Sequence, residues 1–143
     1  MGLPALTKDI MTTDVLYCTE VDSLVSAHEM LRDKHIRHLP VVSSQSGDYI
    51  GLITQKVVLK QAFLAASSGK GAGGLMPDVE VKDVMVNNVE TIQPQLPLVD
   101  AGNYFVDSKH GCLPVVVNGK LEGIITSADF VKLAVTLLNG SGS

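Results

Sequence analysis

The stretch Leu39-Pro40-Val41-Val42 occurs a second time as Leu113-Pro114-Val115-Val116, 74 residues further along the chain. When residues 9–42 are placed on residues 83–116, 11 of the 34 aligned positions are identical. A second block, Gly51-Leu52-Ile53-Thr54, matches Gly123-Ile124-Ile125-Thr126 with a shift of 72. Self-similarity at a fixed spacing is typical of a repeated structural unit, so the sequence indicates an internal duplication.

Each copy has the same order of predicted elements. A short apolar run, at residues 15–18 and again at 89–92, predicts a strand, and a helix with apolar residues at i, i+3 and i+7 follows it. Asp22 or Ser23 is the predicted cap of this helix in the first copy, and Pro97 takes the first helical position in the second.

Two strands then form a hairpin. In the second copy they are joined by Asn118-Gly119, a pair that tolerates positive φ angles and is a strong hairpin signal. An apolar helix closes each copy. The predicted fold class is therefore α/β, in the sense of α+β, with the unit β-α-β-β-α occurring twice.

The copies are assigned to residues 8–66 and 81–138. Between them, residues 67–80 have the composition of a flexible Gly/Ser-rich linker. Their glycines lack the spacing and the Gly-Lys-Ser/Thr ending of a phosphate-binding loop. Residues 139–143 are small and polar, and we expect a disordered tail there.

Composition narrows the function classes. Of the 143 residues 45% are hydrophobic and 18% charged, which excludes a disordered chain. No apolar run is long enough to span a membrane, and a net charge of −4 without a basic cluster argues against nucleic-acid binding. The two cysteines form no disulfide framework and the first eleven residues lack a signal-peptide pattern, so we expect a cytoplasmic location.

The repeated residues resemble those of a CBS domain, a module named after cystathionine β-synthase. The first copy carries the resemblance in Asp9-Ile10-Met11-Thr12, Ala27, Leu39–Val42 and Gly51-x-Ile53-Thr54; the second carries it in Asp83-Val84-Met85, Ala101, Leu113–Val116 and Gly123-x-Ile125-Thr126-x-x-Asp129. The resemblance implies a tandem pair, or Bateman module, in which two copies are related by a pseudo-twofold axis and small mixed sheets are flanked by helices.

The resemblance also implies a cleft on either side of that axis. Such clefts bind an adenosine-containing regulatory ligand: AMP, ADP, ATP or S-adenosylmethionine. The module is then not an enzyme and requires no cofactor, and it passes the occupancy of the cleft to an effector protein, whose identity the sequence leaves open. The alternative is a structural dimerisation module that binds no ligand.

By this resemblance, one cleft uses Thr126, Ser127 and Asp129. A carboxylate can accept the two cis hydroxyls of a ribose, while hydroxyls and free amides at a helix N-terminus can face phosphate. The opposite wall is implied to come from the first copy, with Met11, Thr12, Leu16, Ile36, Arg37 and His38. Leu16 and Ile36 would sandwich an adenine, and Arg37 would pair with phosphate.

Purely structural roles also fit some of these residues. Thr126 at the N-cap and Asp129 at position N3 also fit a helix cap, and the two roles are compatible. Arg37 also fits a solvated surface arginine.

The second cleft is predicted to be weaker. It would combine Thr54, Val57, Met85, Glu90, His110 and Gly111. Val57 stands where the ribose-binding aspartate would be, and Glu90 would repel phosphate if it pointed inward. We therefore expect one competent site per chain, or two sites of unequal affinity.

Metal binding and catalysis have little support in the sequence. A site made of His35, His38, His110 and Cys112 lacks a carboxylate or a second cysteine at ligand spacing, so no metal is expected. No residues form a nucleophile or acid–base constellation at a known spacing, so no catalytic residue is predicted.

The closing helix of each copy is apolar around more than one side, a pattern typical of a buried or interface helix. The residues are Val57, Val58, Leu59 and Phe63 in the first copy and Phe130, Val131, Leu133, Leu137 and Leu138 in the second. We therefore expect a homodimer that forms through these helices.

Overall fold

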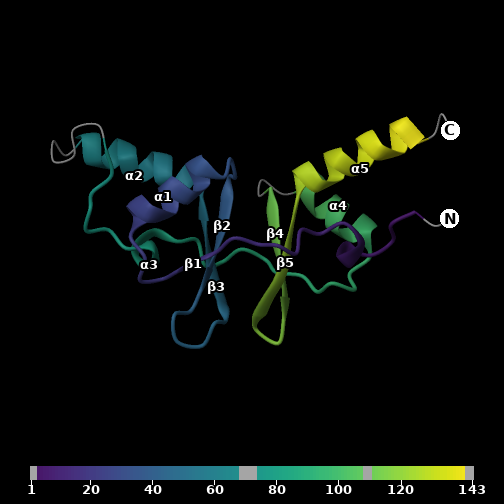
Figure 1. Cartoon of the computed structure of the whole chain (residues 1–143), viewed down its shortest axis with the longest axis horizontal. Helices are drawn as coiled ribbons and strands as arrows, with labels where there is room; N and C mark the ends of the chain where they lie inside the picture. Colours follow the sequence, from purple (N-terminus) through teal and green to yellow (C-terminus); the bar gives the residue numbers. More distant parts are fainter. Residues whose placement is uncertain (1–2, 68–73, 108–110, 141–143) are drawn as a thin grey trace. The chain divides into compact units, whose positions relative to one another are not determined.

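The computed structural model describes residues 3–67, 74–107 and 111–140, and the chain divides into two compact units (Figure 1). Unit 1 contains Met1–Val15 and Glu90–Ser143, and unit 2 contains Leu16–Val89. Each unit thus combines the hairpin of one copy with the segment that precedes the first strand of the other copy. The repeat along the sequence and the compact units in space therefore have different boundaries.

Unit 2 is built on a three-stranded sheet. Strand β1 (Cys18–Thr19) pairs in parallel with β2 (His38–Val42), which pairs antiparallel with β3 (Tyr49–Thr54). The free edge of β3 is extended by Val86, which exchanges backbone hydrogen bonds of 2.8 Å with Leu52. The start of the second copy therefore adds to the sheet of the first.

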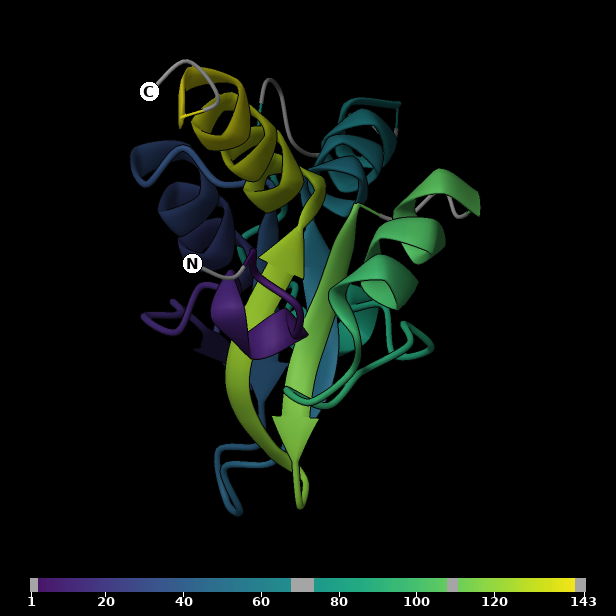
Figure 2. The same cartoon turned by 90° about the vertical axis from the view of Figure 1, so that its right-hand side faces the viewer.

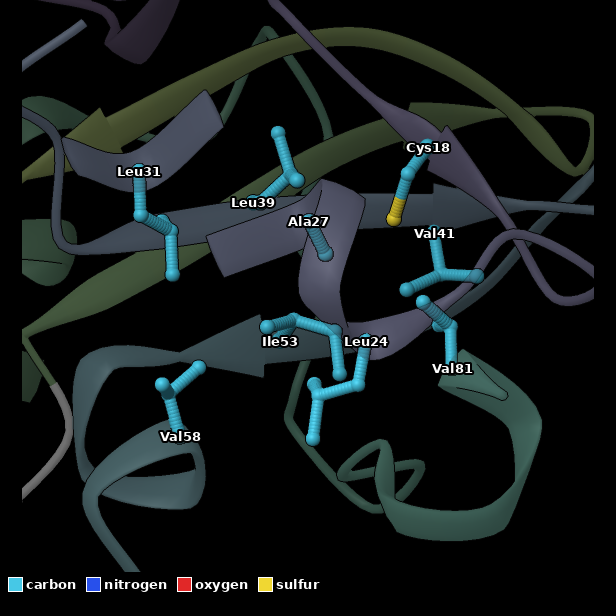
Figure 3. Packing of buried hydrophobic residues seen from close by; sticks show 9 residues of the cluster. All are labelled: Cys18, Leu24, Ala27, Leu31, Leu39, Val41, Ile53, Val58 and Val81. Carbon is cyan, nitrogen blue, oxygen red and sulfur yellow. The ribbon is translucent and has the colours of Figure 1, made fainter. Parts of the chain in front are cut away.

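Three helices accompany this sheet: α1 (Leu24–Asp33), α2 (Gln55–Ser67) and the short α3 (Val81–Val84). Of the two predicted caps of α1, Ser23 is the one used, because its hydroxyl accepts the amide of Ser26 at 3.1 Å. Figure 3 shows how the helices and strands contribute to one core, in which Leu24, Leu39 and Ile53 have no exposed surface. The helical spacing of the first copy is thus confirmed.

Unit 1 repeats this plan with α4 (Leu98–Asp107), the hairpin of β4 (Cys112–Val117) and β5 (Lys120–Thr126), and α5 (Ser127–Gly140), as Figure 2 shows. The predicted turn is confirmed, since Asn118 and Gly119 have φ angles of 51° and 82°. Both hairpins shift register at the same repeat position, between Val41 and Val42 and between Val115 and Val116. This shared irregularity supports the duplication.

The N-terminal segment is anchored in unit 1 by a 3-10 helix, η1 (Thr7–Asp9). Thr7 is fully buried and its hydroxyl donates to the carbonyl oxygen of Leu96 at 2.9 Å. Further on, Thr12 and Ile124 exchange backbone hydrogen bonds of 2.8 and 2.9 Å. The edge of β5 is therefore paired at one position, just as Val86 pairs with β3 at one position.

One predicted strand is absent from the described residues. Residues 89–92 form only a single parallel bridge, in which Ile92 pairs with Val115. Ile92 donates to Pro114 and accepts from Val116, but the next donor toward residue 90 would be Pro114 and the next donor beyond Ile92 would be Pro94. Proline has no backbone N–H, so the ladder stops after one residue.

Two helix boundaries also differ from the sequence prediction. Pro97 lies one residue before α4 rather than at its first position, and its carbonyl accepts the amide of Asp100 at 3.0 Å. Helix α5 extends to Gly140, so the first two residues of the predicted tail continue the helix. Of the predicted linker, residues 68–73 lie outside the described residues, while residues 74–80 lead into α3.

Candidate ligand site at the start of α5

The candidate site in unit 1 centres on Asp129, a carboxylate with only 8% of its surface exposed. It lies in the first turn of α5, which begins directly after β5. The first amides of a helix have no acceptor within the helix, and the amide of Ser127 has a long contact of 3.4 Å to the carbonyl of Gly111. One oxygen of Asp129 accepts the backbone amide of Thr126 at 2.9 Å and is 3.4 Å from the Thr126 hydroxyl. One bond of the predicted capping pair, from the amide of Thr126 at the N-cap to the carboxylate of Asp129 at N3, is thus present.

The other oxygen of Asp129 faces the N-terminal segment. The hydroxyl of Thr12 donates to it over 3.4 Å, which is long for a hydrogen bond between oxygens and therefore weak. Among the described residues, no cation forms an ion pair with Asp129. One side of this buried carboxylate is therefore only weakly paired and can accept stronger donors.

Close backbone packing holds Thr12 in this place. A Cβ added to Gly123 would lie 2.8 Å from the carbonyl oxygen of Thr12 and 3.0 Å from the sulfur of Met11. Because real Cβ atoms do not approach so closely, only glycine at position 123 lets the segment lie against β5 in this way. Met11 and Thr12, both predicted from the family resemblance, thus come together with Asp129.

The negative charge of Asp129 also acts on Cys112, the fully buried first residue of β4. Burial raises the pKa of the Cys112 thiol to about 12, and the charge of Asp129 adds to this effect. Sequence reasoning about the ligand site did not include Cys112 or Gly123. The recurrence of glycine at positions 51 and 123 was the signal that could have pointed to the close approach.

The remaining residues predicted for the first cleft are distributed over both units. Ser127 is exposed at the first position of α5 in unit 1. Leu16, Ile36, Arg37 and His38 belong to unit 2. There, Ile36 is half-buried against the core, whereas Arg37 is exposed and its carbonyl accepts the amide of Gln55 at 3.0 Å.

The equivalent corner of unit 2 is apolar. Position 57 is a valine that packs against the core. Its backbone amide donates a hydrogen bond of 3.1 Å to the hydroxyl of Thr54. Helix α2 is therefore capped without a carboxylate. Met85 lies beside Gly51, where an added Cβ would be 2.8 Å from the methionine sulfur.

Three residues predicted for the second cleft come after Val89, the last residue of unit 2, and fall within the range of unit 1. Glu90 is exposed in unit 1 and borders an open hollow that also reaches Asp100 and Tyr104. Gly111 is half-buried, and its carbonyl lies 3.4 Å from the amide of Ser127. His110 lies outside the described residues. Among the described residues, no three metal-binding side chains come together.

Comparison with known proteins agrees with this architecture. The CBS domain family matches the chain twice, at residues 8–63 and 81–136. The chain is 28% identical to an AcuB-type protein of Vibrio cholerae, with a TM-score of 0.81 and coverage of 99% of this chain and 98% of the other.

Two further similar structures were solved with ligands. CBSX2 in complex with AMP is 25% identical, with a TM-score of 0.76 over 94% of this chain and 98% of CBSX2. The CBS domain pair of MJ0100, in complex with 5′-methylthioadenosine and S-adenosylmethionine, is 25% identical, with a TM-score of 0.73 over 90% of this chain and 98% of that pair. Two curated relatives are the proteins MJ1404 of Methanocaldococcus jannaschii and YlbB of Bacillus subtilis. The chain spans 32% of the length of MJ1404 and 77% of the length of YlbB.

No helix within the described ranges has both the length and the apolar character needed to cross a bilayer. The family matches cover most of the chain, and the similar structures contain the same small sheets flanked by helices. The chain therefore belongs to the CBS domain family and contains a tandem pair of these domains.

Proposed function

We propose that this chain is a regulatory module that binds an adenosine-containing ligand, with Asp129 as the acceptor for the ribose hydroxyls. The observation that carries the proposal is the difference between two helix starts. At the start of α2 the Thr54 hydroxyl accepts the Val57 amide and the Arg37 carbonyl accepts the Gln55 amide, so the fold does not require a carboxylate at this repeat position. Asp129 is nevertheless buried, and among the described residues its outer oxygen has only the long contact to Thr12.

The chemistry of a ribose fits this carboxylate. A carboxylate oxygen has two lone pairs, so Asp129 can keep the amide of Thr126 and still accept two hydroxyl donors. Hydrogen bonds to a charged group contribute about 1.5–3 kcal/mol each, more than the weak contact to Thr12 that they would replace. The AMP complex of CBSX2 and the S-adenosylmethionine complex of MJ0100 support an adenosine compound as the ligand.

Other residues are assigned to this ligand by the family resemblance. We propose that Thr12 and Ser127 contact it through their hydroxyls, that Leu16 and Ile36 contact the adenine, and that Arg37 pairs with phosphate. Met11 and His38 are proposed as further contacts. Because Val57 replaces the aspartate in unit 2 and Glu90 adds a negative charge, we propose that each chain binds one ligand strongly and a second one weakly or not at all.

A thermal-shift screen with AMP, ADP, ATP and S-adenosylmethionine tests the proposal. A ligand present at 100 times its dissociation constant stabilises the folded chain by about 2.7 kcal/mol. We expect at least one of the four to raise the melting temperature, and Asp129→Ala to remove the shift. If none of them stabilises the protein, a structural dimerisation module without a ligand becomes the better assignment.

A second pair of measurements separates the proposed contacts. Arg37→Ala should weaken binding of AMP but leave binding of adenosine unchanged, because only AMP carries a phosphate. Equal losses for both compounds would contradict a phosphate role for Arg37.

We further propose that the module is a non-catalytic cytoplasmic homodimer that reports ligand occupancy to an effector protein. The apolar residues predicted for the dimer contact fall into a buried group and an exposed group. Val58 is buried and Phe130 and Leu133 pack on the core, whereas Leu59, Phe63, Val131 and Leu138 are between 62% and 75% exposed. Exposed apolar stripes of this kind are typical of interfaces. Sedimentation that gives a monomer at micromolar concentration would contradict the homodimer.

A further inference from the structure

The loop that leads into α4 borders a hollow in unit 1. Residues 90–96 pair with β4 through a single bridge, at Ile92. Beyond this bridge the loop is held by η1, because the amide and the hydroxyl of Thr7 both donate to the carbonyl oxygen of Leu96 at 2.9 Å. A hollow of about 440 Å³ lies between this loop and α4. Its shape is therefore set by η1 and by the interrupted strand.

The hollow combines an apolar part with two carboxylates. Ile92, Leu96, Leu113 and Tyr104 contribute the apolar part, and Glu90 and Asp100 contribute the carboxylates. Of the described residues that line the hollow, none carries a positive charge. Its volume falls within the range of about 300–1,000 Å³ that is typical of small-molecule sites. The lining therefore favours a ligand that is both apolar and positively charged.

The charges of both carboxylates are available to a ligand. In the described part of the chain, neither Glu90 nor Asp100 belongs to an ion pair. The cation of η1, Lys8, adjoins Asp9 in sequence and does not line the hollow. Asp100 has a structural role as well, since a negative charge in the first turn of α4 stabilises the start of the helix. Glu90 lies in the loop before the helix and is exposed.

The two carboxylates are specific to unit 1. By the repeat, Glu90 and Asp100 correspond to Leu16 and Ser26 of unit 2. There, the hydroxyl of Ser26 donates to the carbonyl oxygen of Ser23 at 2.9 Å and so belongs to the start of α1. The same backbone plan thus forms with an apolar and a neutral residue at these positions, and the fold does not demand the negative charges.

Tyr104 adds an aromatic ring to the hollow. The ring packs edge-on against Phe105, with 5.6 Å between the ring centroids, so it is held in place before a ligand enters. The face of an aromatic ring attracts cations, and a wall that is already ordered lowers the entropic cost of binding.

We propose that this hollow binds a small organic cation in which an ammonium group is attached to an apolar body. Glu90 and Asp100 accept the N–H donors of the ammonium group, and these charge-assisted hydrogen bonds are stronger than neutral ones. Ile92, Leu96 and the ring of Tyr104 contact the apolar body. Glu90 was also predicted for the second cleft, where its charge opposes phosphate; a cationic ligand interacts favourably with the same charge.

Three probes with the same aromatic body test the role of charge. At neutral pH phenethylamine is a cation, phenethyl alcohol is neutral and phenylacetate is an anion. Each is titrated into the wild-type chain while amide NMR signals are followed. We expect phenethylamine to shift the signals of residues 90–104 and to bind at least about tenfold more tightly than the other two compounds.

Two double variants separate the hollow from general charge effects. Glu90→Gln with Asp100→Asn removes both carboxylates and keeps the side-chain shapes, so the affinity for phenethylamine should fall by about tenfold or more. Asp107→Asn with Glu122→Gln removes the same charge from exposed positions of unit 1 that do not line the hollow, and binding should stay unchanged.

Thermal melting checks that each variant folds. If the loss of Asp100 destabilises α4, Glu90→Gln alone gives the same test, because this side chain is exposed and should weaken phenethylamine without lowering the melting temperature.

Several results would overturn the proposal: no shift with phenethylamine at millimolar concentration, equal affinity for all three compounds, equal losses in both double variants, or shifts centred on Asp129 instead of residues 90–104. None of these readouts involves an adenosine compound. The proposed function and the cation site can therefore fail independently of each other.

Discussion

Unit 1 and unit 2 share a backbone plan but differ in chemistry at one corner. In both, a leading segment pairs with the outer strand of the hairpin, through Thr12 and Ile124 in unit 1 and through Val86 and Leu52 in unit 2. In unit 1 this corner carries a threonine and a buried aspartate, whereas the equivalent positions 86 and 57 in unit 2 are both valine. The backbone pairing is thus independent of the polar pair, which leaves the polar pair available for ligand binding.

The largest expected effect concerns the two glycines that let the leading segments approach. A Cβ at Gly123 would lie 2.8 Å from a backbone oxygen, that of Thr12. Gly123→Ala should therefore displace the segment and lower the free energy of unfolding by about 1–3 kcal/mol, measured by denaturant titration.

Gly51→Ala is the matched change in unit 2. Its nearest neighbour would be the side-chain sulfur of Met85 at 2.8 Å, with the backbone oxygen of Val86 further away at 3.1 Å. A methionine can rotate away, so the loss of stability should be smaller than for Gly123→Ala. Equal losses would show that the two corners are packed alike.

A smaller effect is expected when the corner of unit 1 is made like that of unit 2. Asp129→Val removes the acceptor of the Thr126 amide and should lower the free energy of unfolding by about 0.5–2 kcal/mol. Asp129→Asn is the control, because an amide oxygen can still accept that hydrogen bond. If Asp129→Asn lowers the free energy of unfolding as much as Asp129→Val does, the charge, rather than the cap, stabilises the helix start.

The two units should differ least in the effect of their buried cysteines, one in each unit. Burial raises the pKa of Cys18 and of Cys112 to about 12, from an ordinary value near 9, with smaller contributions from Asp22 and Asp129 respectively. Between these values the folded state binds more protons than the unfolded state, so stability is complete below about pH 9 and falls as the pH rises toward 12.

Denaturation at a series of alkaline pH values checks this expectation. In the double variant Cys18→Ala and Cys112→Ala, the free energy of unfolding should fall less steeply with alkaline pH than in the wild-type chain. The two single variants should each reduce this fall by similar amounts. An unchanged decline in the double variant would assign the alkaline loss of stability to other groups.

Local sequence signals predicted much of the fold. The turn at Asn118-Gly119, the cap at Ser23 and the apolar spacing of α1 depend on neighbouring residues, and all three are confirmed. The strand at residues 89–92 was wrong because an apolar run does not reveal that Pro114 and Pro94 remove the ladder donors on either side of Ile92.

The candidate site was harder to predict from composition and spacing. Thr12 and Asp129 are 117 residues apart, and only the family resemblance grouped them. The repeat also does not show which sheet a leading segment joins, since Thr12 and Val86 occupy the same position in their copies. The contact with β5 became visible only in the structure, through the backbone pairing of Thr12 with Ile124.

Calorimetric titration of the wild-type chain, Asp129→Ala and Val57→Ala with the adenosine ligand found in the thermal-shift screen tests the central claim most directly. We predict about one strong site per wild-type chain, a loss of affinity of roughly tenfold or more in Asp129→Ala, and no change in Val57→Ala. Two sites of equal affinity in the wild-type chain, or an unchanged affinity in Asp129→Ala, would contradict the assignment of the strong site to unit 1.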